Sequence, residues 1–369
     1  DRMLYIYSVN TKSKDGSENN NTGLSAETIR ECLYTLKKPE AVTVTAQNSH
    51  VISIPGKRLF EEYTVYYTDP AFWKVFDFKF LSGKPFTEAD FNSGLPHVVI
   101  SDKLAGILFG TQDVVGRDIL VNNVMPCTIA GVVKRPSKAA SEAFADVWMP
   151  YTANTLYTNS GGCDGMCGPF GAEILAHKLS DIDAIYAEIQ QGVARYNAGK
   201  ADFILTIPKP FTHLELALGS GSRYGYNRVG WGEYLKTTGW VLLFLLLVPT
   251  LNLTGIVQSA VQKRRPEMGL RKAFGATGER LFTQVVCENL IITLIGGVLG
   301  VGLSVVLLYV GRSFLLTKDT VITFGMLFQP LLFVAALFFT LVLNVLSSGL
   351  PAFRIARERI VESLKDANV

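Results

Sequence analysis

The chain carries three long apolar stretches in its C-terminal third, and the region before them has no stretch of comparable length. Each is built around a run without Asp, Glu, Lys or Arg, and apolar runs of about 20 residues are long enough to cross a bilayer as helices. We expect membrane spans at about 238–260, 288–311 and 328–350. Residues 1–236 have charged and polar positions throughout, which is typical of a soluble domain.

The segment that joins the first two spans, 262–281, is strongly basic. Its cationic residues outnumber its acidic ones, and they are Lys263, Arg264, Arg265, Arg271, Lys272 and Arg280. Because basic loops stay on the cytoplasmic side, we place this loop and the tail 353–369 in the cytoplasm and residues 1–236 outside the membrane. Export of a large N-terminal domain needs a preceding signal, so we expect a membrane helix ahead of Asp1.

The first part of the exported region has the pattern of a β-α-β unit. Residues 3–9 alternate into a strand, and the polar stretch 10–23, which is rich in Asn and Ser, is expected to be a loop. Ser25 is placed to cap a helix that Pro39 stops, and a strand follows at 42–46.

The same order recurs near the end of the exported region. A strand is predicted at 173–177, a helix from Asp181 to about Tyr196 with Ser180 as its cap, and a strand at 203–207. Two such units separated by an insertion predict an α+β domain with a split β-α-β lobe.

The insertion, at about 51–150, is expected to form a second, mostly β lobe. Its predicted strands are 59–68, 75–81, 97–100, 119–133 and 146–151. Ser101 is placed to cap a short helix that Gly110 ends, and the pair Asn122-Asn123 is suited to a hairpin turn.

Cys163 and Cys167 lie in a glycine-rich loop of the exported region. They could form a short disulfide, which an oxidising compartment permits, or remain two free thiols. A metal site is disfavoured because no His or second Cys pair stands nearby at zinc spacing.

The sequence offers little enzymatic chemistry. It contains no G-x-x-x-x-G-K-[ST] phosphate loop, no H-E-x-x-H and no G-x-S-x-G, and its four histidines are scattered. The net charge of +3 arises largely from the cytoplasmic loop and tail, so it indicates orientation and contact with anionic lipid. We expect no catalytic residue, metal or cofactor in this chain, and no nucleic acid partner.

The basic loop has the pattern of a short helix. Pro266 suits a first turn, Glu267 can pair with Arg271 four residues on, and Gly275 can end the helix. Leu270, Ala273 and Phe274 fall on one face and Arg271 and Lys272 largely on another. Such an amphipathic surface can lie on lipid or enter the groove of a partner, and the pattern leaves both open.

The run from Arg264 to Thr277 resembles the cytoplasmic signature of MacB/FtsX-type ABC permeases, R-R-x-E-I-G-[IL]-R-[KR]-A-[LF]-G-A. Three further segments resemble the same family in the same order: 72–83 and 99–110 resemble its periplasmic core domain, and 350–364 its C-terminal end, in versions common among Bacteroidota. Pro266 and Ile360 depart from the family pattern, and Ile360 leaves the geometry of the tail open.

The resemblance implies a four-helix permease of the bacterial inner membrane whose first helix precedes Asp1, and whose periplasmic domain lies between helices one and two. It implies a homodimer or heterodimer and a separate cytoplasmic ATPase subunit that binds ATP and Mg. The residues that would contact this ATPase are Glu267, Gly269, Leu270, Arg271, Lys272, Ala273, Phe274, Gly275 and Ala276.

Several uses of such a permease are compatible with the sequence. The main hypothesis is mechanotransmission, in which ATP hydrolysis moves the periplasmic domain and exports a periplasmic peptide, lipid-linked molecule or drug. Alternatives are release of lipoproteins from the membrane, regulation of a cell-wall hydrolase without transport, and a structural anchor without an ATPase. A periplasmic adaptor or hydrolase would be a further partner.

Overall fold

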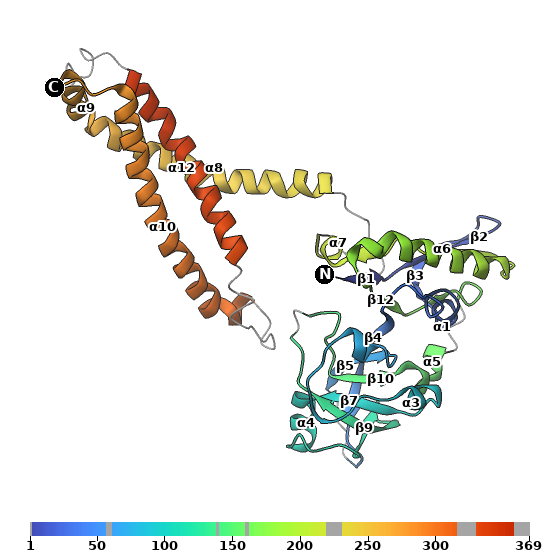
Figure 1. Ribbon diagram of the computed structural model, residues 1–369. Coiled ribbons are helices and arrows are strands. Elements are labelled where there is room, and N and C mark those ends of the chain that lie inside the picture. The colour runs from blue at the N-terminus through green and yellow to red at the C-terminus, as the bar shows by residue number, and fades with distance from the viewer. Residues whose placement is uncertain are drawn as a thin grey trace. The chain divides into compact units, whose positions relative to one another are not determined.

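The chain forms two compact units, Asp1–Val229 and Gly230–Val369, each described by itself below (Figure 1). The computed structural model describes residues 2–56, 61–137, 140–158, 162–218, 231–315 and 330–357. Several expectations therefore fall wholly or partly outside the described residues: the start of the strand at 59–68, the first two residues of the span at 328–350, and most of the tail 353–369.

A ten-stranded sheet organises the N-terminal unit. Its strands in spatial order are β14 (Phe211–Thr212), β1 (Met3–Ile6), β12 (Gly171–Leu175), β4 (Ala41–Ser53), β5 (Glu62–Thr68), β10 (Val147–Pro150), β7 (His97–Ser101), β9 (Met125–Val133) and β6 (Phe80–Gly83), and β8 (Asp118–Val121) pairs with β4 and β9. The first part of β4 pairs with β12, and the rest pairs with β5 and β8. One long strand thus carries the sheet from the first lobe into the insertion.

The first β-α-β unit is split by a strand from far along the chain. β12 lies between β1 and β4 and is antiparallel to both. Between β1 and β4 in sequence come α1 (Ala26–Thr28) and the π-helix η1 (Ile29–Leu33). Ser25 begins this helical segment, because its hydroxyl accepts a hydrogen bond from the Thr28 amide at 3.0 Å, as the sequence predicted.

The second unit differs from the predicted pattern. Its helix α6 (Ile182–Ala198) leads to β13 (Phe203–Thr206), and β13 pairs with β2 (Val9–Ser13) in a separate four-stranded sheet. The order in that sheet is β11 (Cys167–Gly168), β3 (Asn19–Leu24), β2 and β13.

The expected loop at 10–23 is wrong, because this stretch forms the β2–β3 hairpin. Thr11 is fully buried, and β13 and β11 pair on the two sides of the hairpin. Strands from distant parts of the chain therefore pair with the backbone of this stretch, although its own side chains favour a turn.

Two local predictions are also wrong. Ser180 does not cap α6, since it lies inside the short helix η3 (Leu179–Asp181) that leads into α6. The strand predicted at 75–81 begins only at Phe80, in β6, because Val75 ends the helix α2 (Phe72–Val75), whose first amide, that of Phe72, donates to the Asp69 carboxylate at 3.2 Å. A buried acceptor upstream overrides the strand propensity of the aromatic run.

Turn and cap chemistry in the insertion follows the sequence closely. Asn122 and Asn123 take positive φ angles of 54° and 58° in the tight turn between β8 and β9, whose adjoining ends Val121 and Met125 pair. Ser101 caps α4 (Asp102–Phe109) by accepting the Leu104 amide at 3.2 Å, and Gly110 ends it at φ 71°. The remaining short helices of this unit are α3 (Glu88–Asn92), η2 (Tyr151–Ala153), α5 (Thr155–Thr158) and α7 (His213–Leu218).

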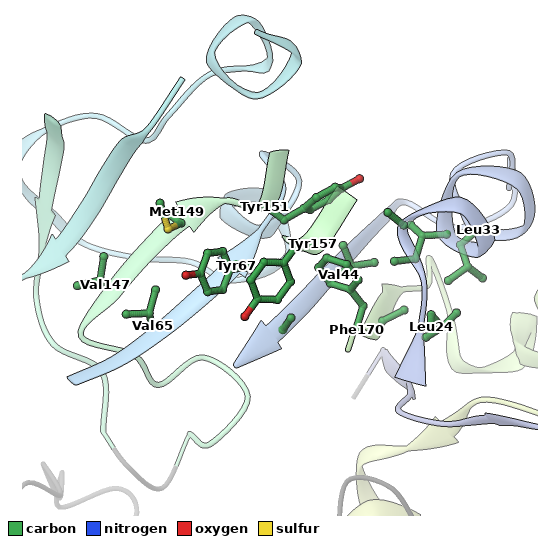
Figure 2. Packing of buried hydrophobic residues seen from close by; sticks show 14 of the residues in the cluster. Leu24, Leu33, Val44, Val65, Tyr67, Val147, Met149, Tyr151, Tyr157 and Phe170 are labelled. Carbon is green, nitrogen blue, oxygen red and sulfur yellow. The ribbon is translucent and has the colours of Figure 1, made fainter. Parts of the chain in front are cut away.

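One apolar core runs through both lobes of the N-terminal unit. Figure 2 shows buried side chains from the first lobe, such as Leu33 and Val44, in one cluster with Val65 and Met149 of the insertion. At the centre the Tyr67 and Tyr157 rings stack with centroids 3.9 Å apart. A second, aromatic cluster is built around the fully buried Trp148, and its other buried members include Tyr66, Phe72 and Phe86. The two lobes therefore share one core rather than fold separately.

The C-terminal unit is helical, with α8 (Trp231–Lys263), α9 (Arg265–Ala273), α10 (Gly278–Leu315) and α12 (Pro330–Arg357). α12 packs against both α8 and α10. Gly297 permits close approach, because a Cβ there would lie 2.5 Å from Leu337 Cδ1. Among the described residues one helical stretch, Gly278–Val310, is long and apolar enough to cross a membrane by itself, and Phe333–Leu343 is a shorter apolar segment.

Candidate functional site

The helix α9 of the C-terminal unit carries most of the residues that the sequence singled out. Its C-terminus is closed by Gly275 at φ 94°, which allows the Ala276 amide to donate to the Arg271 carbonyl at 3.0 Å. Because only glycine adopts this left-handed conformation readily, the chain turns sharply here and enters α10 three residues later. The helix is therefore a short, well-bounded rod joined to a long one.

Polar side chains link one face of α9 to the beginning of α10. Arg271 donates to Glu267 at 2.5 Å, as the four-residue spacing predicted, and also to Gln284 Oε1 at 3.0 Å. About two turns earlier, directly before α9 begins, Arg264 Nη1 donates to both carboxylate oxygens of Glu288, at 2.7 and 2.8 Å. These side chains are about half exposed, so the contacts contribute little stability but fix the register of the two helices.

Apolar residues fill the space beneath this polar link. Leu281 and Val285 of α10 are 6% and 9% exposed, and they line a small gap together with Met268 of α9. Gly269 is buried on the same helix. The inner face of α9 thus packs against α10 of the same chain.

The outer face of α9 is apolar and uncovered. Leu270 is 53% exposed and Phe274 is 85% exposed, and residues four apart lie on the same side of a helix. Ala273 is exposed as well. A large exposed phenylalanine beside a leucine is the kind of surface that a partner or a lipid layer covers.

The structure describes the contacts of two of the three charged residues that the sequence assigned to partner contact. Glu267 and Arg271 bind each other and α10, so intramolecular contacts already engage them. The side chain of Lys272 lies outside the described residues. The contact role of all three stays a prediction.

In the N-terminal unit, Cys163 and Cys167 form a disulfide with their Cα atoms 5.5 Å apart. The carbonyls of the loop between them are held from two sides: Ser25 Oγ donates to Gly165 at 2.5 Å, and Lys200 Nζ donates to Asp164 at 2.7 Å. The disulfide loop therefore connects the beginning of α1 to the end of α6.

Asp69 is a buried carboxylate that the sequence did not single out. It accepts hydrogen bonds from Tyr34 Oη at 2.5 Å and Thr43 Oγ1 at 2.7 Å, and from the Val44 and Phe72 amides at 3.3 and 3.2 Å. Burial raises the pKa of Asp69 to about 6, although these hydrogen bonds act in the opposite direction. An acid that directly follows a strand rich in Tyr and Thr and precedes Pro70 was the signal that could have found it.

Asp69 holds two lobes together. Tyr34 and Thr43 belong to the first lobe, whereas Phe72 begins α2 in the insertion.

For metals, the described residues contain no group of three or more His, Cys, Asp or Glu side chains arranged to hold an ion.

Comparison with known families matches both units. The model of the MacB-like periplasmic core domain matches residues 1–192, which is more than half of the chain, and that of the FtsX-like permease C-terminal region matches 239–360. The chain belongs to the MacB/FtsX-type ABC transporter permeases. Members of this family are inner membrane proteins with a periplasmic domain, so the N-terminal unit corresponds to that domain and the C-terminal unit to the membrane part.

Curated relatives of this permease are similar along most of its length. It is 25% identical over 304 residues to the uncharacterized ABC transporter permease YknZ of Bacillus subtilis, which covers 82% of this chain and 70% of YknZ. It is 28% identical over 303 residues to the macrolide export ATP-binding/permease protein MacB of Escherichia coli, which covers 79% of this chain and 42% of MacB. The alignment thus spans less than half of MacB.

Solved structures similar to this permease include the periplasmic region of MacB from Actinobacillus actinomycetemcomitans, with 17% identity, a TM-score of 0.39, and coverage of 56% of this chain and 88% of that one. The extracellular domain of YknZ is similar at 18% identity with a TM-score of 0.38, covering 55% of this chain and 99% of that one.

Proposed function

We propose that this chain is the permease subunit of an ABC transporter-type complex, in which a cytoplasmic ATPase docks on the outer face of α9. The observation that carries the proposal is the division of α9 into a face fixed to its own chain and an uncovered pair, Leu270 and Phe274. An apolar anchor of this kind suits insertion into a groove on a partner. ATP and Mg would be bound by the ATPase, because the sequence of this chain has no phosphate loop.

The connection between α9 and α10 suggests how movement would be transmitted. Arg271 of α9 and Arg264, directly before α9, bind α10 at two levels, and α10 continues as one helix to Leu315. A displacement of α9 by the ATPase would therefore tilt α10 as a lever instead of bending the loop between them. The charge-free spans suit lever helices better than a hydrophilic pore.

The proposed setting is the bacterial inner membrane, crossed several times, with the chain acting as a homodimer or heterodimer. The expected spans 238–260 and 288–311 lie within α8 and α10, and 328–350 overlaps α12. The basic residues of the loop 262–281 support a cytoplasmic position of α9 by the positive-inside rule. Export of a periplasmic peptide, lipid-linked molecule or drug is the proposed use, and the similarity to the macrolide export protein of E. coli supports it.

The test replaces the exposed pair by acids. Leu270→Asp with Phe274→Asp should abolish co-purification of an ATPase with the tagged full-length permease. The matched control is Val124→Asp with Leu156→Asp, which alters two residues of the N-terminal unit that are 81% and 79% exposed, and it should leave the complex intact. Retention of the ATPase by the α9 variant would overturn the assignment.

A second readout separates a protein partner from lipid. If the outer face of α9 instead rests on headgroups, the variant would retain the ATPase, and a peptide of residues 262–281 would lose binding to anionic vesicles on the same two substitutions. Loss of the ATPase with unchanged vesicle binding supports docking.

A further inference from the structure

A cavity of about 390 Å³ opens in the N-terminal unit where its two lobes meet. One side is formed by the end of η1 and the chain that leads into β4, and the other by the segment after β5 together with α3. Its volume lies within the range of small-molecule sites, and interfaces between lobes are common places for them.

Apolar side chains form part of the cavity wall, beside polar groups. Leu33, Leu36 and Val42 line it from the first lobe, and Pro70 and Phe91 from the insertion. Leu33 is fully buried and belongs to the core cluster, against which Leu36, Val42 and Phe91 also pack. The apolar surface in the cavity is therefore a continuation of the core, with a fixed shape.

The charged groups of the cavity all have one sign. Glu40, Asp69 and Glu88 line it, and none of the lining residues that the structure describes is Lys, Arg or His. Glu40 is paired with Arg2 at 2.7 Å, and Asp69 is held by its four hydrogen bonds. Glu88 is exposed at the beginning of α3, so it is the carboxylate most accessible to a ligand.

The cavity is preformed. The Tyr34 hydroxyl, on one wall, donates to Asp69, on the other, at 2.5 Å, and Asp69 also accepts from Thr43 in the adjoining strand β4. These bonds hold the two lobes at a fixed separation around the cavity. A ligand would therefore meet rigid walls and lose little free energy to ordering them.

We propose that this interlobe cavity binds an organic cation with an apolar body, whose body packs between Leu36 and Phe91 and whose cationic group pairs with Glu88. An anionic ligand would meet the exposed carboxylate of Glu88, and an uncharged one would gain only the apolar contact. The inference goes beyond the proposed function, because such a pocket binds its ligand whether or not an ATPase moves the chain.

The experiment measures binding of three probes that share one apolar body. 4-Phenylbutylammonium, 4-phenylbutanol and 4-phenylbutyrate are titrated against the full-length permease in phosphatidylcholine nanodiscs by saturation-transfer NMR, with empty nanodiscs subtracted. We expect the ammonium probe to bind about 1.4- to five-fold more tightly than the alcohol, since an exposed ion pair contributes about 0.2–1 kcal/mol. The carboxylate probe should bind most weakly.

Two variants locate the site. Glu88→Gln should remove the preference for the ammonium probe, whereas Glu18→Gln, a change at a distant exposed carboxylate, should keep it. Ala71→Phe, which places a ring in the cavity, should weaken all three probes. Equal binding of ammonium and alcohol to the wild type, or an unchanged preference in Glu88→Gln, would overturn the proposal even if Ala71→Phe fails to fold.

Discussion

The two units of this permease use aromatic side chains in opposite ways. Trp148 in the N-terminal unit is fully buried among other rings, whereas Trp240 in the C-terminal unit is 63% exposed on α8. Burial from water stabilises the first arrangement. The second leaves apolar surface that matches a lipid environment, where helices associate through close packing such as that at Gly297.

The two units also differ in where they keep their charged side chains. The N-terminal unit buries carboxylates, and Asp69 and Glu173 are held by hydroxyl groups such as those of Thr43 and Thr45. The C-terminal unit keeps its ion pairs half exposed around α9. A buried network fixes a fold because breaking it is costly, and an exposed one orients a helix that remains free to meet a partner.

The largest expected effect tests the difference between the two tryptophans. Trp148→Ala should lower the free energy of unfolding of the N-terminal unit by about 3–5 kcal/mol, because it leaves a large cavity in the aromatic cluster. Trp240→Ala is the matched control and should leave that free energy unchanged. Hydrogen exchange of the sheet amides in the full-length chain measures both, and equal destabilisation by the two changes would remove the contrast.

The next effect concerns the buried carboxylate. A folded-state pKa of about 6, raised from 3.8, means that the folded chain binds more protons between these values, so Asp69 contributes stability at low pH that is lost as the pH rises through 6. In Asp69→Asn the stability of the N-terminal unit should therefore rise less on acidification from pH 7 to pH 4, as urea titrations at several pH values would show.

Asp15 provides the control for this pH dependence. Hydrogen bonds from Ser13 and Ser17 lower the pKa of this exposed carboxylate to about 2, so its contribution is present above pH 4 and is lost only below it. Asp15→Asn should leave the profile between pH 4 and pH 7 unaltered. An Asp69→Asn profile that is also unaltered would contradict the role assigned to burial.

A smaller loss is expected from the disulfide. Replacing Cys163 and Cys167 by Ser should destabilise the N-terminal unit by roughly 2 kcal/mol, since the bond closes a short loop. Dithiothreitol should lower the melting temperature of the wild type and leave that of the variant unaffected. Equal sensitivity of both proteins would show that the bond does not stabilise the fold.

The smallest effect is expected for the ion pair between Glu267 and Arg271 on α9. A double-mutant cycle with Glu267→Ala and Arg271→Ala should give a coupling energy of about 0.3–0.5 kcal/mol. The same changes should reduce the ATP-dependent response of the complex more than its assembly, because they loosen α9 from α10. Full retention of that response would argue against transmission of movement from α9 to α10.

Local patterns in the sequence predicted much of the fold. The charge-free runs lie in long helices, and the caps at Ser25 and Ser101 and the turn at Asn122-Asn123 formed as expected. Each depends on neighbouring residues alone. The hairpin at 10–23 was missed because its partners, β11 and β13, come from more than 140 residues away.

The candidate site shows the same division. The spacing of Glu267 and Arg271, the helix end at Gly275 and the apolar positions of Leu270 and Phe274 could all be read from the sequence. The contact of Arg271 with Gln284 could not, because it depends on how α9 folds back on α10. That contact decides which face of the helix remains available.

The sequence by itself determined where helices and turns begin, because capping, helical period and charge-free length act within a few residues. Only the tertiary structure decided which strands meet and which acid is buried. β12 enters between β1 and β4, and Asp69 collects donors from three separate segments. Such arrangements follow from closing one apolar core over distant parts of the chain, and no local pattern encodes that choice.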